Sequence, residues 1–458
     1  MGTKIALLKN FGSSTVIQVS NIVIKFVQVP LLISFLGVEQ YGQWLVLYSF
    51  PMMFAMADFG FGSVAANDIS LNIAANNINQ AKIVHSTAFA SLITITLVGL
   101  LGLLFIAPFI NWVNYFGMNS NRQDELVLAV IFLGASVFIS LPVAVWTGRF
   151  RAAEKAHLGT LMSGIKQWVS FLFLIIALFF TTRFDFLALG ALIGSITYFV
   201  LFSTISKYYY PELKFQFNFI KKDYIKPLLV QGMSFQTLAL ANALQNQGML
   251  IIIQGTLGAV QVAVFSTIRT VINTCIQAMG MINQVTWPEF SILIGKGDFK
   301  KAARLHHLAS LANYTISIVG FFVLLLIGPI LIKFWTKGEI IIDRHALFYF
   351  VIVIPLVGSY ATSAVVLAAC NRIKKQALLF LLGTLLNLIL CWFLSKYLGI
   401  IGAGLSMTVV YIISFYHVFY TAIEITEDTP RNFITSVLNE TKNFFTLILK
   451  KINLTINK

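Results

Sequence analysis

Twelve apolar stretches, each long enough to cross a lipid bilayer, follow one another along this chain of 458 residues. A bilayer core of roughly 30 Å needs about 20 predominantly apolar residues in helical form. No water satisfies backbone groups inside lipid, so runs of this length predict membrane-spanning helices and an all-α polytopic membrane protein. They lie approximately at residues 12–36, 42–64, 83–111, 126–148, 158–181, 185–206, 226–254, 258–284, 305–335, 345–369, 376–396 and 399–422.

The second six stretches repeat the first six at a constant offset of 221 residues. The matching pairs include Asn21 and Asn242, Gly37 and Gly258, His85 and His306, Pro108 and Pro329, and Arg151 and Arg372. Duplicated halves around a central path are typical of secondary transporters, and six spans per half predict a parallel repeat about an axis along the membrane normal. The predicted parts are an N-terminal lobe at 1–206, a linker at 207–225, a C-terminal lobe at 226–423 and a tail at 424–458.

Positive charge is concentrated in alternate loops. Most of the 32 lysines and arginines lie on the side that holds loops 149–155, 207–226, 296–304 and 372–375, together with both termini. The positive-inside rule therefore predicts cytoplasmic termini. Because the net charge of +15 is spread over several loops, it predicts contact with anionic membrane lipid rather than nucleic acid.

The tail combines apolar residues with lysines. It carries Phe433, Val437, Phe444, Leu447 and Ile448 together with Lys442, Lys450 and Lys451. This pattern predicts a basic amphipathic segment on the inner leaflet, with a frayed tail as the alternative.

Polar residues within the predicted spans follow helical spacing. Gln18, Asn21, Lys25 and Gln28 share one face of the first span, and Arg269, Asn273 and Gln277 share one face of the eighth; the seventh carries Asn242 and Asn246. Polar faces within a bilayer must meet water or other polar groups. Spans 1, 7 and 8 are therefore predicted to line a shared water-filled cavity, to which Asp58 adds the second span.

Four charged residues lie deep in the predicted spans: Lys25, Asp58, Lys166 and Arg269. A charge at mid-helix costs roughly 2.5–3.5 kcal/mol on insertion scales, so such residues usually mark a functional path. Three cations and one carboxylate favour an anionic solute, and the planar donor fork of arginine suits phosphate.

Each of these residues also has a structural interpretation. Lys25 and Asp58 could form an ion pair, Arg269 could bind backbone carbonyls and Lys166 could extend to the interface. Asp58 could instead cap a helix break before Gly60. No zinc-protease, nucleophile-elbow, P-loop or dinucleotide motif is present, which argues against an enzyme and a bound cofactor.

The run Pro30-Leu-Leu-Ile-Ser-Phe-Leu-Gly37, followed by Tyr41-Gly-Gln-Trp44, Asp58-Phe-Gly-Phe-Gly62 and Asn67, resembles the opening of O-antigen flippases. These form the polysaccharide-transporter branch of the multidrug/oligosaccharidyl-lipid/polysaccharide (MOP) exporter superfamily. The resemblance implies two six-helix lobes forming a V around a central cavity in a bacterial inner membrane. It also implies export of an undecaprenyl-pyrophosphate-linked oligosaccharide, with membrane lipids, an O-antigen polymerase and glycosyltransferases as partners.

The working hypothesis is therefore an alternating-access flippase. The pyrophosphate would bind Lys25 and Arg269, with Lys166 as a further position, and Asp58 would hold a coupling proton or sodium ion. The glycan would contact Gln18, Asn21, Gln28, Asn242, Asn246, Asn273 and Gln277. The alternatives are a small-molecule antiporter with an acid-lined cavity, an oligosaccharide polymerase or glycosyltransferase with a large outer loop, and an accessory membrane protein.

Overall fold

The computed structural model describes residues 2–116, 118, 122–153, 155–370 and 372–442, and these are helical apart from short connections. Ten segments within this part of the chain are long and apolar enough to cross a membrane. The prediction of an all-helical, multi-pass membrane protein is therefore confirmed. The membrane in question and the orientation of the termini stay predictions.

The helical segments follow the predicted spans closely. Spans three to six and eight to twelve each coincide with one segment, whereas Gly12–Ile73 covers the first two together. The predicted seventh span falls on three consecutive elements, α9 (Ile225–Ala243), the π-helix η5 (Leu244–Gly248) and α10 (Met249–Leu257). The total of twelve spans stays a prediction.

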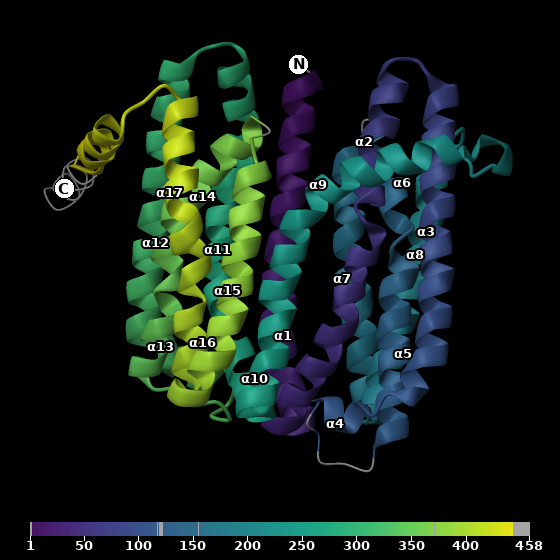
Figure 1. Cartoon of the computed structure of the whole chain (residues 1–458), viewed down its shortest axis with the longest axis vertical. Coiled ribbons are helices and arrows are strands. Elements are labelled where there is room, and N and C mark those ends of the chain that lie inside the picture. The colour runs from purple at the N-terminus through teal and green to yellow at the C-terminus, as the bar shows by residue number, and fades with distance from the viewer. Residues whose placement is uncertain (1, 117, 119–121, 154, 371, 443–458) are drawn as a thin grey trace, which may run out of the picture. The chain divides into compact units, whose positions relative to one another are not determined.

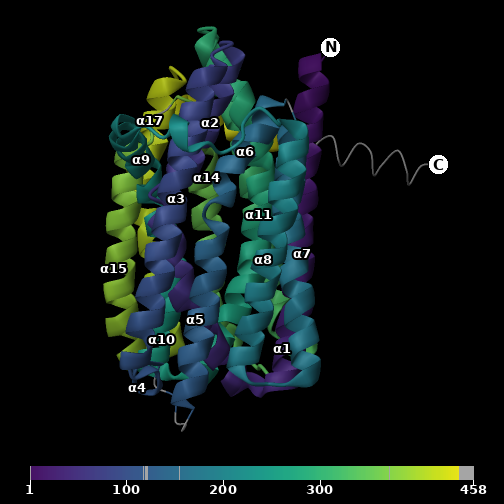
Figure 2. The same cartoon turned by 90° about the vertical axis from the view of Figure 1, so that its right-hand side faces the viewer.

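The first compact unit comprises Met1–Ser266 and Trp335–Ile340. Besides α9, η5 and α10 it contains α1 (Gly2–Met52), η1 (Met53–Asp58), α2 (Phe61–Ala74), α3 (Ile78–Ile106), η2 (Ala107–Phe109), α4 (Trp112–Phe116), α5 (Gln123–Ser140), α6 (Val143–Ala152), α7 (Ala156–Phe180), α8 (Phe184–Tyr209), η3 (Phe217–Phe219) and η4 (Lys222–Tyr224). Helix α8 packs on both α5 and α7, and α2 packs on α3 and α6 (Figures 1 and 2).

Small residues allow these helices to approach closely. A Cβ at Gly194 of α8 would lie 3.0 Å from the Cα of Ser170 in α7, and one at Gly148 of α6 would lie 3.0 Å from the Cα of Ala66 in α2. Helices surrounded by lipid gain little from apolar burial against each other, so close backbone packing at small residues is a main source of their association.

Helix α1 bends at Gly37, whose φ of 75° and ψ of 167° interrupt the helical backbone. Gly258, its partner in the sequence repeat, has φ 85° and ψ 174° between α10 and α11. Only glycine adopts this region without strain, so both halves use the same residue to turn from one helix into the next. Farther back along α1, Pro30 lacks the N–H that would bond Phe26 O, and Trp335 Nε1 donates to that carbonyl at 2.7 Å instead.

The second compact unit comprises Thr267–Phe334 and Ile341–Lys458. Its helices are α11 (Ala259–Gly295), which starts in the first unit, α12 (Phe299–Trp335), α13 (Arg344–Val351), α14 (Val353–Ala369), α15 (Lys374–Leu398), α16 (Ile400–Ser406) and α17 (Thr408–Ile425). Helices α14 and α15 both pack along α17 (Figure 1). The lobe and linker boundaries predicted from the repeat stay predictions.

The predicted amphipathic tail is described in part. Residues 430–442 are helical, whereas Phe444, Leu447, Ile448, Lys450 and Lys451 lie outside the described residues. Phe433 is buried against Phe419 and Ile423, and Val437 packs against the same cluster, so this helix packs on α17 through two apolar residues.

Candidate functional site

The polar face predicted for the first span lies on α1. Lys25 is exposed, and Gln18, Asn21 and Gln28 are half-buried. The side-chain oxygens of Gln18 and Asn21 are buried and accept no hydrogen bond within the described part of the chain. A buried carbonyl oxygen without a donor costs about 1–3 kcal/mol.

The polar residues of the predicted seventh span lie on α9 and η5. Asn242 Nδ2 donates to Leu238 O at 2.9 Å, and Asn246 Nδ2 donates to Asn242 O at 2.8 Å. The π-helix widens the turn at Asn246, and such bulges often occur at functional sites. Helix α1, which contains the predicted first span and the start of the second, packs against η5 and α10.

The remaining residues predicted to contact the substrate lie on two other helices, α11 and α7. Arg269, Asn273 and Gln277 are half-buried on one face of α11, in the second unit. Lys166 lies in α7 with its Nζ 5.5 Å from the ring centroid of Tyr198 in α8. This cation–π contact gives Lys166 a local partner, and both its role at the pyrophosphate and its extension to the interface stay predictions. The cavity shared by spans 1, 7 and 8 stays a prediction.

Asp58 lies at a break in the predicted second span, between η1 and α2. Its Oδ1 accepts hydrogen bonds from Gly60 N at 2.9 Å and from Gln236 Nε2 at 3.2 Å. Phe59 and Gly60 have φ of 47° and 76°, so the Asp58 carboxylate caps a left-handed turn. This is the helix-break cap that was one of the alternatives for Asp58. Asp58 thus has a local role, and its role in ion coupling stays a prediction.

Gln236 of α9 is a partner that the sequence reasoning missed. The same Nε2 that reaches Asp58 also donates to Met56 O at 2.8 Å, which fixes α9 to the break. The backbones meet closely here, since a Cβ at Gly232 would lie 2.1 Å from Phe59 O. A polar residue inside an apolar span was the available signal for Gln236.

A second polar junction was also missed, inside the second unit. Asn313 of α12 is fully buried, and its Nδ2 donates to Asn283 Oδ1 of α11 at 2.9 Å and to Thr362 Oγ1 of α14 at 2.7 Å. One amide therefore joins three helices. Hydrogen bonds of this kind between membrane helices are typically worth about 0.6 kcal/mol each.

Arg149, at the end of α6, holds the segment after α8 against α3. The side chain is 2% exposed, its Nη1 donates to Ser206 Oγ at 3.0 Å, and its Nη2 donates to Leu213 O. Nη2 also lies 3.0 Å from His85 Nε2. A guanidinium only donates, so this ring nitrogen must be the acceptor. We call these four residues the linker clasp.

The linker continues along α3 by backbone hydrogen bonds. Gln216 N donates to Ser86 Oγ at 3.3 Å, and Lys221 N donates to Thr87 Oγ1 at 3.0 Å. The linker is therefore folded back onto the third predicted span rather than extended between the halves.

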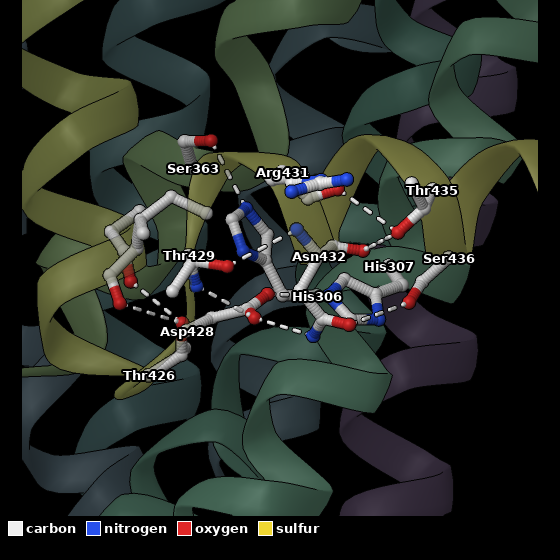
Figure 3. Close-up of polar contacts among 12 residues, drawn as sticks. His306, His307, Ser363, Thr426, Asp428, Thr429, Arg431, Asn432, Thr435 and Ser436 are labelled. Atoms are coloured by element: carbon white, nitrogen blue, oxygen red, sulfur yellow. Dashed lines mark hydrogen bonds and ion pairs between the residues drawn. The ribbon is translucent and has the colours of Figure 1, made fainter.

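A corresponding arrangement holds residues 428–433 against α12 (Figure 3). His307 Nε2 lies 2.6 Å from Asp428 Oδ2, and the Phe433 ring centroid lies 4.9 Å from that of His306. His306, the repeat partner of His85, is bonded to Ser363 Oγ at 3.0 Å. We call His306, His307, Asp428 and Phe433 the tail clasp.

The carboxylate of the tail clasp is stabilised in its charged form. Burial raises the pKa of Asp428, but hydrogen bonds from Asn432, His307 and the Thr429 N–H outweigh burial and hold the pKa below its usual value. No group of three or more His, Cys, Asp or Glu side chains among the described residues could hold a metal ion.

Comparison with known proteins adds family and fold. A family model described as polysaccharide biosynthesis protein matches residues 7–293. No curated protein matches the chain in sequence. Among solved structures, an inward-facing multidrug resistance MATE family transporter of the MOP superfamily superposes with a TM-score of 0.72 at 15% identity, covering 90% of this chain and 99% of that one.

Two further structures show the same fold. The MATE multidrug transporter DinF-BH has a TM-score of 0.68 at 16% identity, covering 93% of this chain and 97% of that one. A MOP superfamily transporter from Pyrococcus furiosus has a TM-score of 0.64 at 16% identity, covering 93% of this chain and 96% of that one. The fold is therefore that of MOP superfamily transporters, a non-enzymatic group.

Proposed function

Because this chain belongs to the polysaccharide biosynthesis protein family, we propose that it moves an undecaprenyl-pyrophosphate-linked oligosaccharide from the inner to the outer leaflet of a bacterial inner membrane. The proposed route is alternating access between two six-helix lobes that form a V and are related by a parallel pseudo-twofold repeat. An O-antigen or capsule repeat unit is the proposed substrate, and Asp58 is the proposed site of ion coupling.

The observation that carries the proposal is the composition of the polar face on α1. Lys25 is the one charged residue between positions 12 and 36, and it lies among Gln18, Asn21 and Gln28. The lysine suits a pyrophosphate, and amides both donate to and accept from sugar hydroxyls. Arg269, Asn273 and Gln277 give α11 the same chemistry.

A small-molecule antiporter is the rival on this fold, since the structurally similar DinF-BH is a multidrug transporter. Exporters of cationic drugs need acidic cavities, whereas the acid deep in the predicted spans, Asp58, is bonded to Gly60 and Gln236. The Pyrococcus structure is described as having a pocket of reverse polarity that suggests a different function. By the same reasoning, the cations Lys25 and Arg269 favour an anionic substrate over a cationic drug.

The test is a leaflet-resolved assay of lipid-linked oligosaccharide in a strain that lacks this chain and any redundant flippase. Cytoplasmic build-up, cured by wild type but not by Lys25→Ala or Arg269→Ala, would support the proposal. Lys396→Ala is the control, because this lysine stacks on Trp392 at 3.5 Å from its ring centroid. Normal outer-leaflet oligosaccharide in the deletion strain would refute flipping, and full export by both alanine variants at wild-type levels would refute the pyrophosphate site.

A further inference from the structure

A pocket of about 450 Å³ lies between the start of α15 and the end of α17, within the second unit. Its lining includes Lys375, Tyr416, His417, Tyr420, Glu424 and Asp428. None of these residues belongs to the polar faces proposed for transport. The pocket is therefore a separate candidate binding site.

The apolar surface of α15 places this pocket at a membrane boundary. Leu378, Leu382 and Ile389 are exposed along one side of the helix. The stripe is bounded by Lys375 and Lys396, and the rise between these two residues is about 31 Å at 1.5 Å per residue. That length matches the hydrocarbon core of a bilayer, so Lys375 lies where phospholipid headgroups lie.

Tyrosines mark the same boundary on α17. Tyr416 and Tyr420 are exposed, and their ring centroids are 4.4 Å apart. Tyrosine is enriched at membrane–water interfaces because its ring is apolar and its hydroxyl is polar. The pocket thus has a polar end and an adjoining apolar surface, as a lipid requires.

The charges of the pocket have both signs. Lys375 is a cation, and His417, whose Nδ1 lies 3.3 Å from Thr421 Oγ1, adds an imidazole to the lining. Glu424 is exposed with its Oε1 3.7 Å from Arg372 Nη1. A purely anionic ligand would meet the Glu424 carboxylate, and a purely cationic one would meet Lys375.

We propose that this pocket binds the headgroup of a zwitterionic phospholipid that carries an ammonium group. The phosphate contacts Lys375 and His417, and the ammonium group contacts Glu424 and the face of the Tyr420 ring. The acyl chains lie along Leu378 and Leu382. Asp428 lines the pocket but is held by His307 and Asn432 and does not contact the lipid.

The test measures lipid binding to the purified full chain by native mass spectrometry. We expect phosphatidylethanolamine binding to weaken about fivefold in Lys375→Gln and in Glu424→Gln, equivalent to roughly 1 kcal/mol each. Phosphatidylglycerol binding should weaken in Lys375→Gln but not in Glu424→Gln. Lys374→Gln is the matched control, an exposed lysine next to Lys375 that does not line the pocket.

Three results would overturn the proposal. Equal binding of the two lipids with no effect of Glu424→Gln would exclude recognition of the ammonium group. Equal loss in Lys374→Gln would show that only the local positive charge matters. Competition by water-soluble phosphoethanolamine as strong as that by the lipid would identify a soluble phosphate site. Because all variants replace exposed residues, unchanged thermal unfolding should accompany each measurement.

Discussion

The guanidinium of Arg149 is buried among neutral acceptors, the Ser206 hydroxyl, the Leu213 carbonyl and the His85 ring. Arginine can serve all three because its donors are arranged in a rigid planar fork. A lysine has one ammonium group at the end of a flexible stem and cannot reach the same three positions. The linker is therefore held by the donor geometry of the guanidinium and not only by its positive charge.

We expect Arg149→Lys to lower the free energy of unfolding by about 1.5–3 kcal/mol, the usual contribution of a hydrogen bond to a charged group. Hydrogen exchange at residues 213–221 should also become faster, because the linker clasp would open more often. Arg151→Lys is the control, since Arg151 is exposed. Unchanged exchange in Arg149→Lys would show that the clasp does not hold the linker.

Gly258 gives a second prediction for a single residue. A side chain at its φ of 85° and ψ of 174° would be strained, and we expect Gly258→Ala to cost about 1–3 kcal/mol in stability. Gly255→Ala, in the preceding helical turn with open space around a new Cβ, should be neutral or stabilising. Thermal unfolding of the two variants compares them directly, and equal melting temperatures would contradict the prediction.

Among the elements, the two clasps repeat one arrangement with different chemistry. In each half the segment that follows the sixth predicted span returns to the third, at His85 of α3 and at His306 and His307 of α12. The linker clasp uses a buried arginine that donates to a hydroxyl and a backbone carbonyl, whereas the tail clasp uses a carboxylate and the Phe433 ring. The two clasps therefore lie at equivalent positions of the sequence repeat but are made by different chemical groups.

The tail clasp should open in acid. Because the folded-state pKa of Asp428 lies below its ordinary value of 3.8, its contribution to tail docking is complete above that pH and is lost as pH falls through the lower, folded-state pKa. Hydrogen exchange at residues 430–442, corrected for the intrinsic pH dependence, should rise at low pH in wild type. Asp428→Asn cannot titrate and should show no such rise; an equal rise in this variant would assign the opening to another group.

For the whole molecule, hydropathy predicted most helices because lipid requires long uninterrupted apolar runs. The same signal could not show that Gln236 reaches Asp58, because these residues lie 178 positions apart and pair only after folding. Nor could it show the π-helix at Asn246, since local apolar composition does not distinguish one helical pitch from another. The pyrophosphate and glycan contacts remain predictions, because they depend on a solute and not on a helix.

Energy coupling is a prediction at the scale of the whole transporter. We expect Asp58→Asn to remove the dependence of flipping on a proton or sodium gradient in reconstituted vesicles, since the variant cannot bind or release a cation at this position. Gln236→Ala is the control, because it removes a hydrogen bond to Asp58 and leaves the titratable group in place. Gradient dependence retained in Asp58→Asn would restrict Asp58 to capping the helix break.

The linker clasp also bears on the order in which the chain is made. His85, Arg149, Ser206 and Leu213 all lie within the first half of the sequence, so the clasp can close while the remaining spans are still being synthesised. The tail clasp needs Asp428 and Phe433, which are made only after the helices of the second unit. A nascent chain whose Leu213 has left the ribosome could therefore already protect the start of its third span, whereas the tail clasp can cover α12 only after Asp428 and Phe433 have emerged.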